Sequence, residues 1–296
     1  MKNIGVIGAG TMGNGIAHVF AQNGFDVNLI DIQAEALEKA MATISKNLDR
    51  QISAGKLDAT EKELILRRII PVTNLADGVS HADLVVEAAT ENTELKLRIF
   101  KEMDNCATAS AILASNTSSI SITKIAAASS RPEKVIGMHF MNPVPMMPLV
   151  EVIRGYATDD ATTDAVMKLS ARLGKTPVEV NDYPGFVANR LLMPMINEAI
   201  YTLYEGVAGV EEIDTVMRLG MSHPMGPLHL ADFIGLDVCL SILQVLQNGF
   251  GQPKYAPCPL LVNMVQAGKL GVKSGEGFYT YLLGTREKKV SARFLK

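Results

Sequence analysis

Short apolar runs alternate with longer amphipathic segments over the first 180 residues of the chain. The runs are rich in Val, Ile, Leu and Ala and indicate buried strands, whereas apolar residues at a helical spacing indicate the helices between them. This pattern predicts strands at 2–7, 27–30, 83–87, 111–114, 135–138, 150–153 and 177–180, and helices at 35–54, 92–106 and 160–173. Such alternation predicts an α/β fold with a doubly wound, mostly parallel sheet.

The pattern changes after residues 182–185, which read Asp-Tyr-Pro-Gly. Beyond them, helical spacing recurs at 188–205, at 210–219, at 228–248 with a break near Gly235, and at 259–267, and no convincing pair of strands is visible. We therefore predict two domains, the sheet domain at 1–184 and an all-helical C-terminal domain at 185–296. The last dozen residues are rich in Lys and Arg and are predicted to form a loosely held tail.

A glycine-rich turn follows the first strand and reads Gly8-Ala9-Gly10-Thr11-Met12-Gly13. A helical pattern comes next, and then a second strand that ends on Asp31. This order matches the dinucleotide-binding fingerprint, in which the glycines allow a tight turn, close approach of a pyrophosphate and close packing of the helix. Asp31 can accept hydrogen bonds from ribose hydroxyls and would repel a 2′-phosphate, so NAD is favoured over NADP.

The cofactor site of this Rossmann-type domain is accordingly predicted at Gly8, Gly10, Thr11, Met12, Gly13 and Asp31. Use of NADP stays open, because one acidic residue shifts the preference without setting it. The other interpretation of the glycines is a tight turn in a different kind of α/β protein.

Charge and composition narrow the classes of function. The formal net charge of −3 argues against a general nucleic-acid binder, and no apolar run approaches the length of a membrane span. The three cysteines are few and widely spaced, which suits neither a disulfide framework nor a zinc site. They indicate reduced thiols in a cytoplasmic protein, and we predict no metal.

Four polar side chains fall where a sheet-based site would need them. Ser118 and His139 each follow or end a predicted strand, Glu151 lies early in another strand, and Asn189 opens the first helix of the second domain. Oxidation of a secondary alcohol needs a base for the hydroxyl proton and donors for the oxygen. His139 with a carboxylate behind it suits the first task, and Ser118 and Asn189 suit the second. Each residue also has a structural interpretation, as a turn, cap or surface residue.

Eight stretches together resemble one enzyme family, the 3-hydroxyacyl-CoA dehydrogenases, and especially its short-chain bacterial members. The matching stretches are 6–13, 114–119, 137–143, 149–153, 184–190, 223–227, 233–237 and 273–279. The resemblance implies that His139 is the general acid and base, that Glu151 is its partner, and that Ser118 and Asn189 bind the substrate oxygen. It further implies NAD contacts at Asp31, Glu91, Lys96, Asn116, Ser118, Asn142 and Lys273, and a homodimer formed through the helical domain. Glu91 and Lys96 also suit a cofactor contact by position, because they flank the turn after the strand that ends at Glu87.

The chain departs from the family pattern at two places that concern coenzyme A. Adjacent lysines, which hold coenzyme A phosphates in the family, are replaced here by the stretch from Arg50 to Lys56, so Arg50, Ser53 and Lys56 are the candidate contacts. The lysine that usually precedes Leu-Val-Glu is Pro148. The sequence leaves two alternative functions open: a related dehydrogenase of a free sugar acid such as L-gulonate, and a sensor that binds NADH without turnover.

Overall fold

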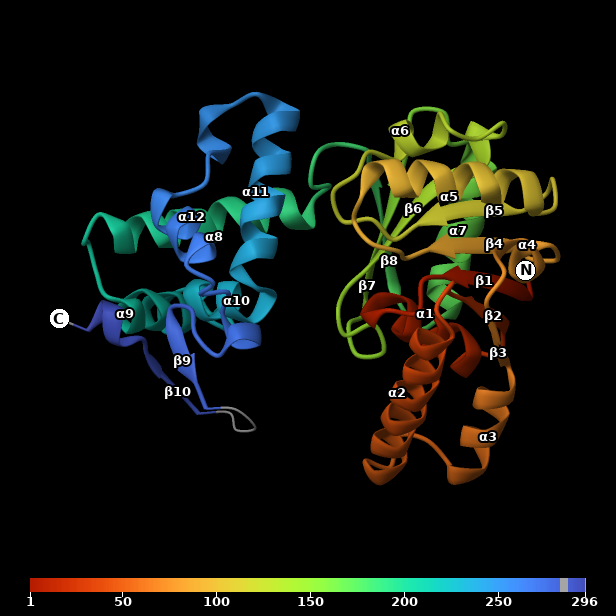
Figure 1. Cartoon of the computed structure of the whole chain (residues 1–296), viewed down its shortest axis with the longest axis horizontal. Helices are drawn as coiled ribbons and strands as arrows, with labels where there is room; N and C mark the ends of the chain where they lie inside the picture. Colours follow the sequence, from red (N-terminus) through yellow and green to blue (C-terminus); the bar gives the residue numbers. More distant parts are fainter. Residues whose placement is uncertain (283–286, 296) are drawn as a thin grey trace. The chain divides into compact units, whose positions relative to one another are not determined.

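The computed structural model describes residues 1–282 and 287–295 (Figure 1). Contacts divide the chain into two compact units, Met1–Tyr183 and Pro184–Lys296. The division falls within one residue of the predicted boundary near Pro184. Each unit has its own apolar core.

An eight-stranded sheet forms the first unit, in the order β3-β2-β1-β4-β5-β6-β7-β8 (Figure 1). Strands β1 to β6 pair in parallel, β7 runs antiparallel to β6, and β8 is parallel to β7. The predicted doubly wound sheet is thus confirmed. The strands are β1 (Asn3–Ile7), β2 (Asp26–Ile30), β3 (Ile69–Val72), β4 (Leu84–Glu87), β5 (Ile112–Ser115), β6 (Val135–Phe140), β7 (Leu149–Arg154) and β8 (Thr176–Asn181).

Helices cover both faces of this sheet because its central strands are apolar on both sides. Alternate residues of one strand serve the two faces: Ile136 and Met138 of β6 join the core that includes Ile16, whereas Gly137 faces Ile122. The helices are α1 (Thr11–Gln22), α2 (Ala34–Ser53), α3 (Ala59–Arg67), α4 (Leu75–Val79), α5 (Thr93–Cys106), α6 (Ile122–Ala126) and α7 (Asp160–Arg172). Helices α4 and α6 were not predicted from the sequence, because five residues are too few to establish a helical period.

The second unit is helical, as predicted, and it buries a separate apolar core. The break expected near Gly235 is present, since that glycine has φ +105° between two helices that bend by 97°. Its helices are α8 (Ala188–Tyr204), α9 (Val210–Thr215) with a π-helical turn after it, α10 (Pro227–Ile234), α11 (Leu236–Phe250) and α12 (Pro259–Gln266).

The expectation that this unit lacks a strand pair is wrong. β9 (Tyr279–Tyr281) and β10 (Lys288–Val290) pair antiparallel. The described part of the basic tail is also held in place, because Ser291 is 1% exposed and its hydroxyl donates to Glu276 Oε1 at 2.9 Å. The two strands were not predicted because three residues are too few to show an alternating pattern. The two strands also contact through their side chains, since the Lys288 ammonium lies 3.5 Å from the ring centroid of Tyr279 in a cation–π interaction.

Asp232 of α10 explains why the segment before the tail packs against the helices. Its buried carboxylate accepts hydrogen bonds from the backbone N–H groups of Phe278 and Tyr279, at 3.0 and 2.9 Å, and from the Tyr281 hydroxyl at 2.9 Å. Burial raises the pKa of Asp232 to about 6, although these hydrogen bonds act in the opposite direction. The carboxylate therefore ties β9 to α10.

Within the residues that the structure describes, no single helix is both long and apolar enough to cross a membrane. Helices α10 and α11 meet the criteria of length and composition only when they are taken together as a bent pair.

A partly buried acid on α5, Asp104, allows a stability prediction. The Asp104 side chain is 9% exposed and accepts hydrogen bonds from Arg131 Nε at 2.7 Å, the Ser130 N–H at 2.6 Å and the Ser129 hydroxyl at 3.0 Å. Burial acts to raise the pKa of Asp104, but these hydrogen bonds outweigh it and lower the pKa to about 2. A lowered folded-state pKa gives stability that is present above the unfolded value and is lost as the pH falls.

We expect Asp104→Asn to lower the free energy of unfolding at pH 7 by about 1–2 kcal/mol. The difference between wild type and variant should shrink to about half by pH 3, because at that pH the Asp104 carboxyl is largely protonated in the unfolded chain but still charged in the folded protein. Urea unfolding at a series of pH values from 7 to 3 measures it. A difference that stays constant over this range would contradict the assignment.

Candidate active site

The turn between β1 and α1 has the shape that a dinucleotide pyrophosphate requires. Gly8 has φ +97°, and a Cβ there would lie 2.7 Å from the Ala88 carbonyl oxygen. A Cβ on Gly13 would lie 1.7 Å from the Gly8 oxygen, so the helix could not pack this closely with any other residue. A Cβ on Gly10 would meet no atom within 4 Å. Two glycines are therefore needed by the backbone, and the third leaves open space at the helix N-terminus, where Thr11 and Met12 begin α1.

Asp31 lies beside this turn at the end of β2. Its Oδ2 accepts a hydrogen bond from the Ala9 N–H at 2.8 Å, and its Oδ1 accepts one from the Gln33 N–H at 3.0 Å. A cavity of about 790 Å³ adjoins the carboxylate, and its lining includes Gly8, Gly10, Asp31, Ile32, Ala88 and Thr90. The residues present thus suit the adenosine half of a dinucleotide, with an acid where a ribose would lie.

His139 and Glu151 face each other across β6 and β7, although 12 positions separate them in the sequence. The antiparallel register pairs them directly, and His139 Nδ1 lies 2.7 Å from Glu151 Oε2. Both side chains are buried, at 8% and 2% exposed. Because β7 runs against β6, its early residue Glu151 lies at the carboxyl edge of the parallel strands, where sites on such sheets form.

The end of β5 brings Ser118 to the same edge. Asn116 is 8% exposed, and its Oδ1 accepts a hydrogen bond from the Phe140 N–H at 2.9 Å, which joins the loop after β5 to the end of β6. Ser118 follows two residues later in the turn before α6. The structure thus gathers Asn116, Ser118, His139 and Glu151 around the ends of neighbouring strands.

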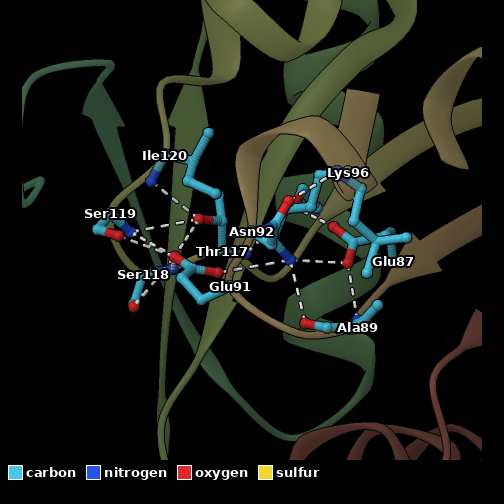
Figure 2. A network of polar contacts seen from close by, with 11 residues as sticks. Glu87, Ala89, Glu91, Asn92, Lys96, Thr117, Ser118, Ser119 and Ile120 are labelled. Atoms are coloured by element: carbon cyan, nitrogen blue, oxygen red, sulfur yellow. Dashed lines mark hydrogen bonds and ion pairs between the residues drawn. The ribbon is translucent and has the colours of Figure 1, made fainter. Parts of the chain in front are cut away.

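Glu91 and Lys96 bridge β4 to the turn that carries Ser118 (Figure 2). The Lys96 side chain is 1% exposed, and its Nζ lies 2.7 Å from Glu87 Oε1 and 3.4 Å from Glu91 Oε2. Glu91 Oε1 accepts hydrogen bonds from the Thr117 hydroxyl at 2.5 Å and from the Ser119 hydroxyl at 2.9 Å. Burial acts to raise the pKa of Glu91, but the Lys96 ammonium and the hydrogen bonds outweigh it and lower the pKa.

From the sequence, Glu87 was identified only as the last residue of a predicted strand. The available signal was an acid at the end of an otherwise apolar run, with a polar residue, Ser115, directly after the next apolar run. A charged residue that is fully buried needs a partner, and the lysine nine positions later supplies one.

The remaining candidates lie elsewhere in their domains. Asn142 is exposed just after β6, and Arg50, Ser53 and Lys56 are exposed at the C-terminal end of α2. In the second unit, Asn189 is the second residue of α8 and is 9% exposed, and Lys273 Nζ lies 2.5 Å from Asp237 Oδ1. Residues 1–282 and 287–295 contain no cluster of three or more side chains that could hold a metal ion.

Comparison with known proteins gives matches to both units. A family described as "3-hydroxyacyl-CoA dehydrogenase, NAD binding domain" matches residues 3–183, and "3-hydroxyacyl-CoA dehydrogenase, C-terminal domain" matches residues 185–281. The dinucleotide-binding prediction is thereby confirmed, with NAD as the cofactor of this domain.

Two relatives and one solved structure are similar over nearly the whole chain. A 3-hydroxybutyryl-CoA dehydrogenase of Bradyrhizobium diazoefficiens is 57% identical and covers 95% of this chain and 96% of its own. A probable 3-hydroxybutyryl-CoA dehydrogenase of Bacillus subtilis is 56% identical, with 95% and 98% covered. The crystal structure of (S)-3-hydroxybutyryl-CoA dehydrogenase from Ralstonia eutropha has 51% identity and a TM-score of 0.92 over 95% of this chain and 99% of its own. The resemblance drawn from the motifs is confirmed.

Proposed function

The chain belongs to the 3-hydroxyacyl-CoA dehydrogenase family, and we propose that it interconverts short-chain (S)-3-hydroxyacyl-CoA and 3-oxoacyl-CoA, such as 3-hydroxybutyryl-CoA and acetoacetyl-CoA. The observation that carries this proposal is the buried His139–Glu151 pair at the edge of a sheet that also holds the glycine turn. An imidazole backed by a carboxylate is the acid and base that an alcohol–ketone interconversion needs.

The two ring nitrogens of His139 have different tasks in this mechanism. Glu151 Oε2 lies at Nδ1, so Nε2 is the nitrogen that exchanges a proton with substrate. In the reduction, protonated His139 donates from Nε2 to the substrate oxygen as the ketone becomes an alcohol. In the oxidation, neutral His139 accepts the hydroxyl proton at Nε2, and the Glu151 carboxylate stabilises the imidazolium that forms. Bound NADH supplies the hydride for the reduction, and NAD accepts it in the oxidation.

We assign the remaining side chains to binding. The Ser118 hydroxyl and the Asn189 amide donate hydrogen bonds to the substrate oxygen, where charge develops as the bond order of the carbonyl changes. Asp31, Glu91, Asn116, Asn142 and Lys273 contact the cofactor, and Lys96, whose buried ammonium lies between Glu87 and Glu91, holds Glu91 in place. The exposed positive charges of Arg50 and Lys56, with the Ser53 hydroxyl between them, suit the phosphates of coenzyme A.

We also propose a cytoplasmic homodimer formed through the helical domain 185–296, with 1–184 as the cofactor domain. Apolar side chains of the second unit divide into two groups that support this. Met193 and Ile196 are buried in the core of the unit, whereas Leu191 and Met221 are 70% and 61% exposed and remain for a partner surface.

Oxidation of NADH by the purified protein with acetoacetyl-CoA tests the proposal. We expect rapid turnover, and a kcat/KM with NADPH that is lower by about tenfold or more, because the Asp31 carboxylate opposes a 2′-phosphate. Acetoacetate without coenzyme A is the control, and it should be a far poorer acceptor. Turnover of free acids alone would favour a sugar-acid dehydrogenase, and NADH binding without any turnover would favour a sensor.

A further inference from the structure

We propose that Glu87 is a positioning residue for the reaction, because its carboxylate sets the turn Thr117–Ser119 that carries Ser118. The inference rests on the proposed function, in which Ser118 binds the substrate oxygen. Glu87 ends β4 and its side chain is fully buried, so it touches no substrate and acts through its neighbours.

The Glu87 carboxylate accepts hydrogen bonds from three directions. Its Oε1 accepts from Lys96 Nζ and from the Ala89 N–H, both at 2.7 Å, and its Oε2 accepts from the Ser115 hydroxyl at 2.7 Å. Bonds to both oxygens fix the plane of the carboxylate. The group is therefore held rigidly at the carboxyl edge of the sheet.

One arm of contacts runs from Glu87 through β5. The register of β4 and β5 pairs Glu87 with Ser115, and the Ser115 oxygen accepts a hydrogen bond from the Thr117 N–H at 3.2 Å. The Glu87 carbonyl oxygen also accepts from the Asn116 N–H at 2.7 Å. The backbone that leads into the turn is thus held by the Glu87 carbonyl at Asn116 and, through the Ser115 hydroxyl, by the Glu87 carboxylate at Thr117.

A second arm runs through the ion pairs and ends on the same turn (Figure 2). Lys96 lies between Glu87 and Glu91, and Glu91 Oε1 accepts hydrogen bonds from the Ser118 and Ser119 N–H groups, both at 3.1 Å, as well as from the hydroxyls of the turn. Without the charge of Glu87, the buried Lys96 ammonium would have Glu91 as its one carboxylate partner. Glu91 would then be drawn toward Lys96 and away from the turn.

Both arms of contacts end on residues 117–119, which indicates that Glu87 serves to position Ser118 and not only to stabilise the fold. A buried ion pair often adds little net stability over apolar residues of similar volume. A reacting group displaced by about 1 Å, by contrast, can lose on the order of 10²-fold in rate. The contacts of Glu87 are therefore expected to matter most for the placement of Ser118.

Glu87→Gln tests the proposal in the full-length protein, because it keeps the size of the side chain and removes its charge. We expect kcat for acetoacetyl-CoA reduction at saturating NADH to fall by about 10- to 100-fold, with KM for acetoacetyl-CoA changed by less than about threefold. Asp104→Asn is the matched control, since it also removes the charge from a partly buried ion pair of the same domain. That control should lose thermal stability yet keep kcat within about twofold of wild type.

Combination with Ser118→Ala separates positioning from general destabilisation. If Glu87 acts through Ser118, Glu87→Gln should slow the Ser118→Ala enzyme by less than about twofold further. Losses that multiply in the double variant would overturn the inference while leaving the proposed function intact. So would wild-type kcat in Glu87→Gln, or wild-type kcat in Ser118→Ala. Absence of turnover in the wild-type enzyme would instead refute the proposed function itself.

Ser115→Ala provides the same comparison if Glu87→Gln does not fold. It removes the hydroxyl that links the Glu87 carboxylate to the Thr117 N–H and leaves the ion pair of Glu87 and Lys96 in place. We expect a fall in kcat of about 3- to 30-fold and, again, little further loss in the Ser118→Ala background. A full multiplicative loss in that background would contradict the proposal.

Discussion

Replacement of His139 by alanine should lower kcat for acetoacetyl-CoA reduction by about 10²–10⁴-fold while NADH binding persists. The imidazole is the group that exchanges the proton in the proposed mechanism, and its Nδ1 contact with Glu151 at 2.7 Å sets the orientation of its Nε2. Water would have to replace it as acid and base, without a fixed position. The cofactor cavity is lined by other residues of the domain, so NADH affinity should change little.

Steady-state rates and a fluorescence titration with NADH measure the two quantities separately. His81→Ala is the control, because His81 is an exposed histidine of the same domain, and its kcat should stay within about twofold of wild type. A loss of less than about tenfold in His139→Ala would argue against a role in proton transfer.

Much of the sheet could be predicted because its strands are apolar on both faces. Such strands read as continuous runs, and β1, β4 and β5 were found from this signal alone. The glycine turn was found because its steric needs exclude other residues, as the 1.7 Å approach of a Cβ on Gly13 to Gly8 shows. Short elements were missed where a period cannot be established, as in α4, α6 and the pair β9–β10.

The sequence allowed the residues of the candidate site to be predicted, but not the contacts between them. His139 and Glu151 were selected for their chemistry, but their direct pairing depends on the antiparallel β7, which no local pattern specifies. Lys96 was expected as a cofactor contact that flanks the turn after β4, and the structure buries its ammonium against Glu87. Whether a charged side chain at a strand or helix end is solvated or paired depends on tertiary contacts, and these lie outside the sequence pattern.

Replacement of Glu151 by glutamine should lower kcat by about 10²–10³-fold in both directions, with the fold retained. Glutamine has nearly the same size but no charge, so it cannot stabilise the imidazolium that forms during the oxidation. Its amide can also present an N–H to Nδ1, which would place the ring proton on Nε2 and block acceptance of the substrate proton. Both effects act through His139, whose ring lies 2.7 Å from the carboxylate.

The double variant His139→Ala/Glu151→Gln should therefore be no slower than His139→Ala alone, within about twofold. Glu179→Gln on the neighbouring strand β8 is the matched control, since its exposed carboxylate contacts Arg154 at the surface, and its kcat should equal that of wild type within about twofold. If Glu151→Gln lost less than about tenfold while its circular dichroism matched wild type, Glu151 would serve packing alone. If the losses multiplied in the double variant, Glu151 would act on a second group besides the imidazole. If His139 and Glu151 act as one proton-transfer unit, Glu151→Gln should lower kcat only in the enzyme that retains His139.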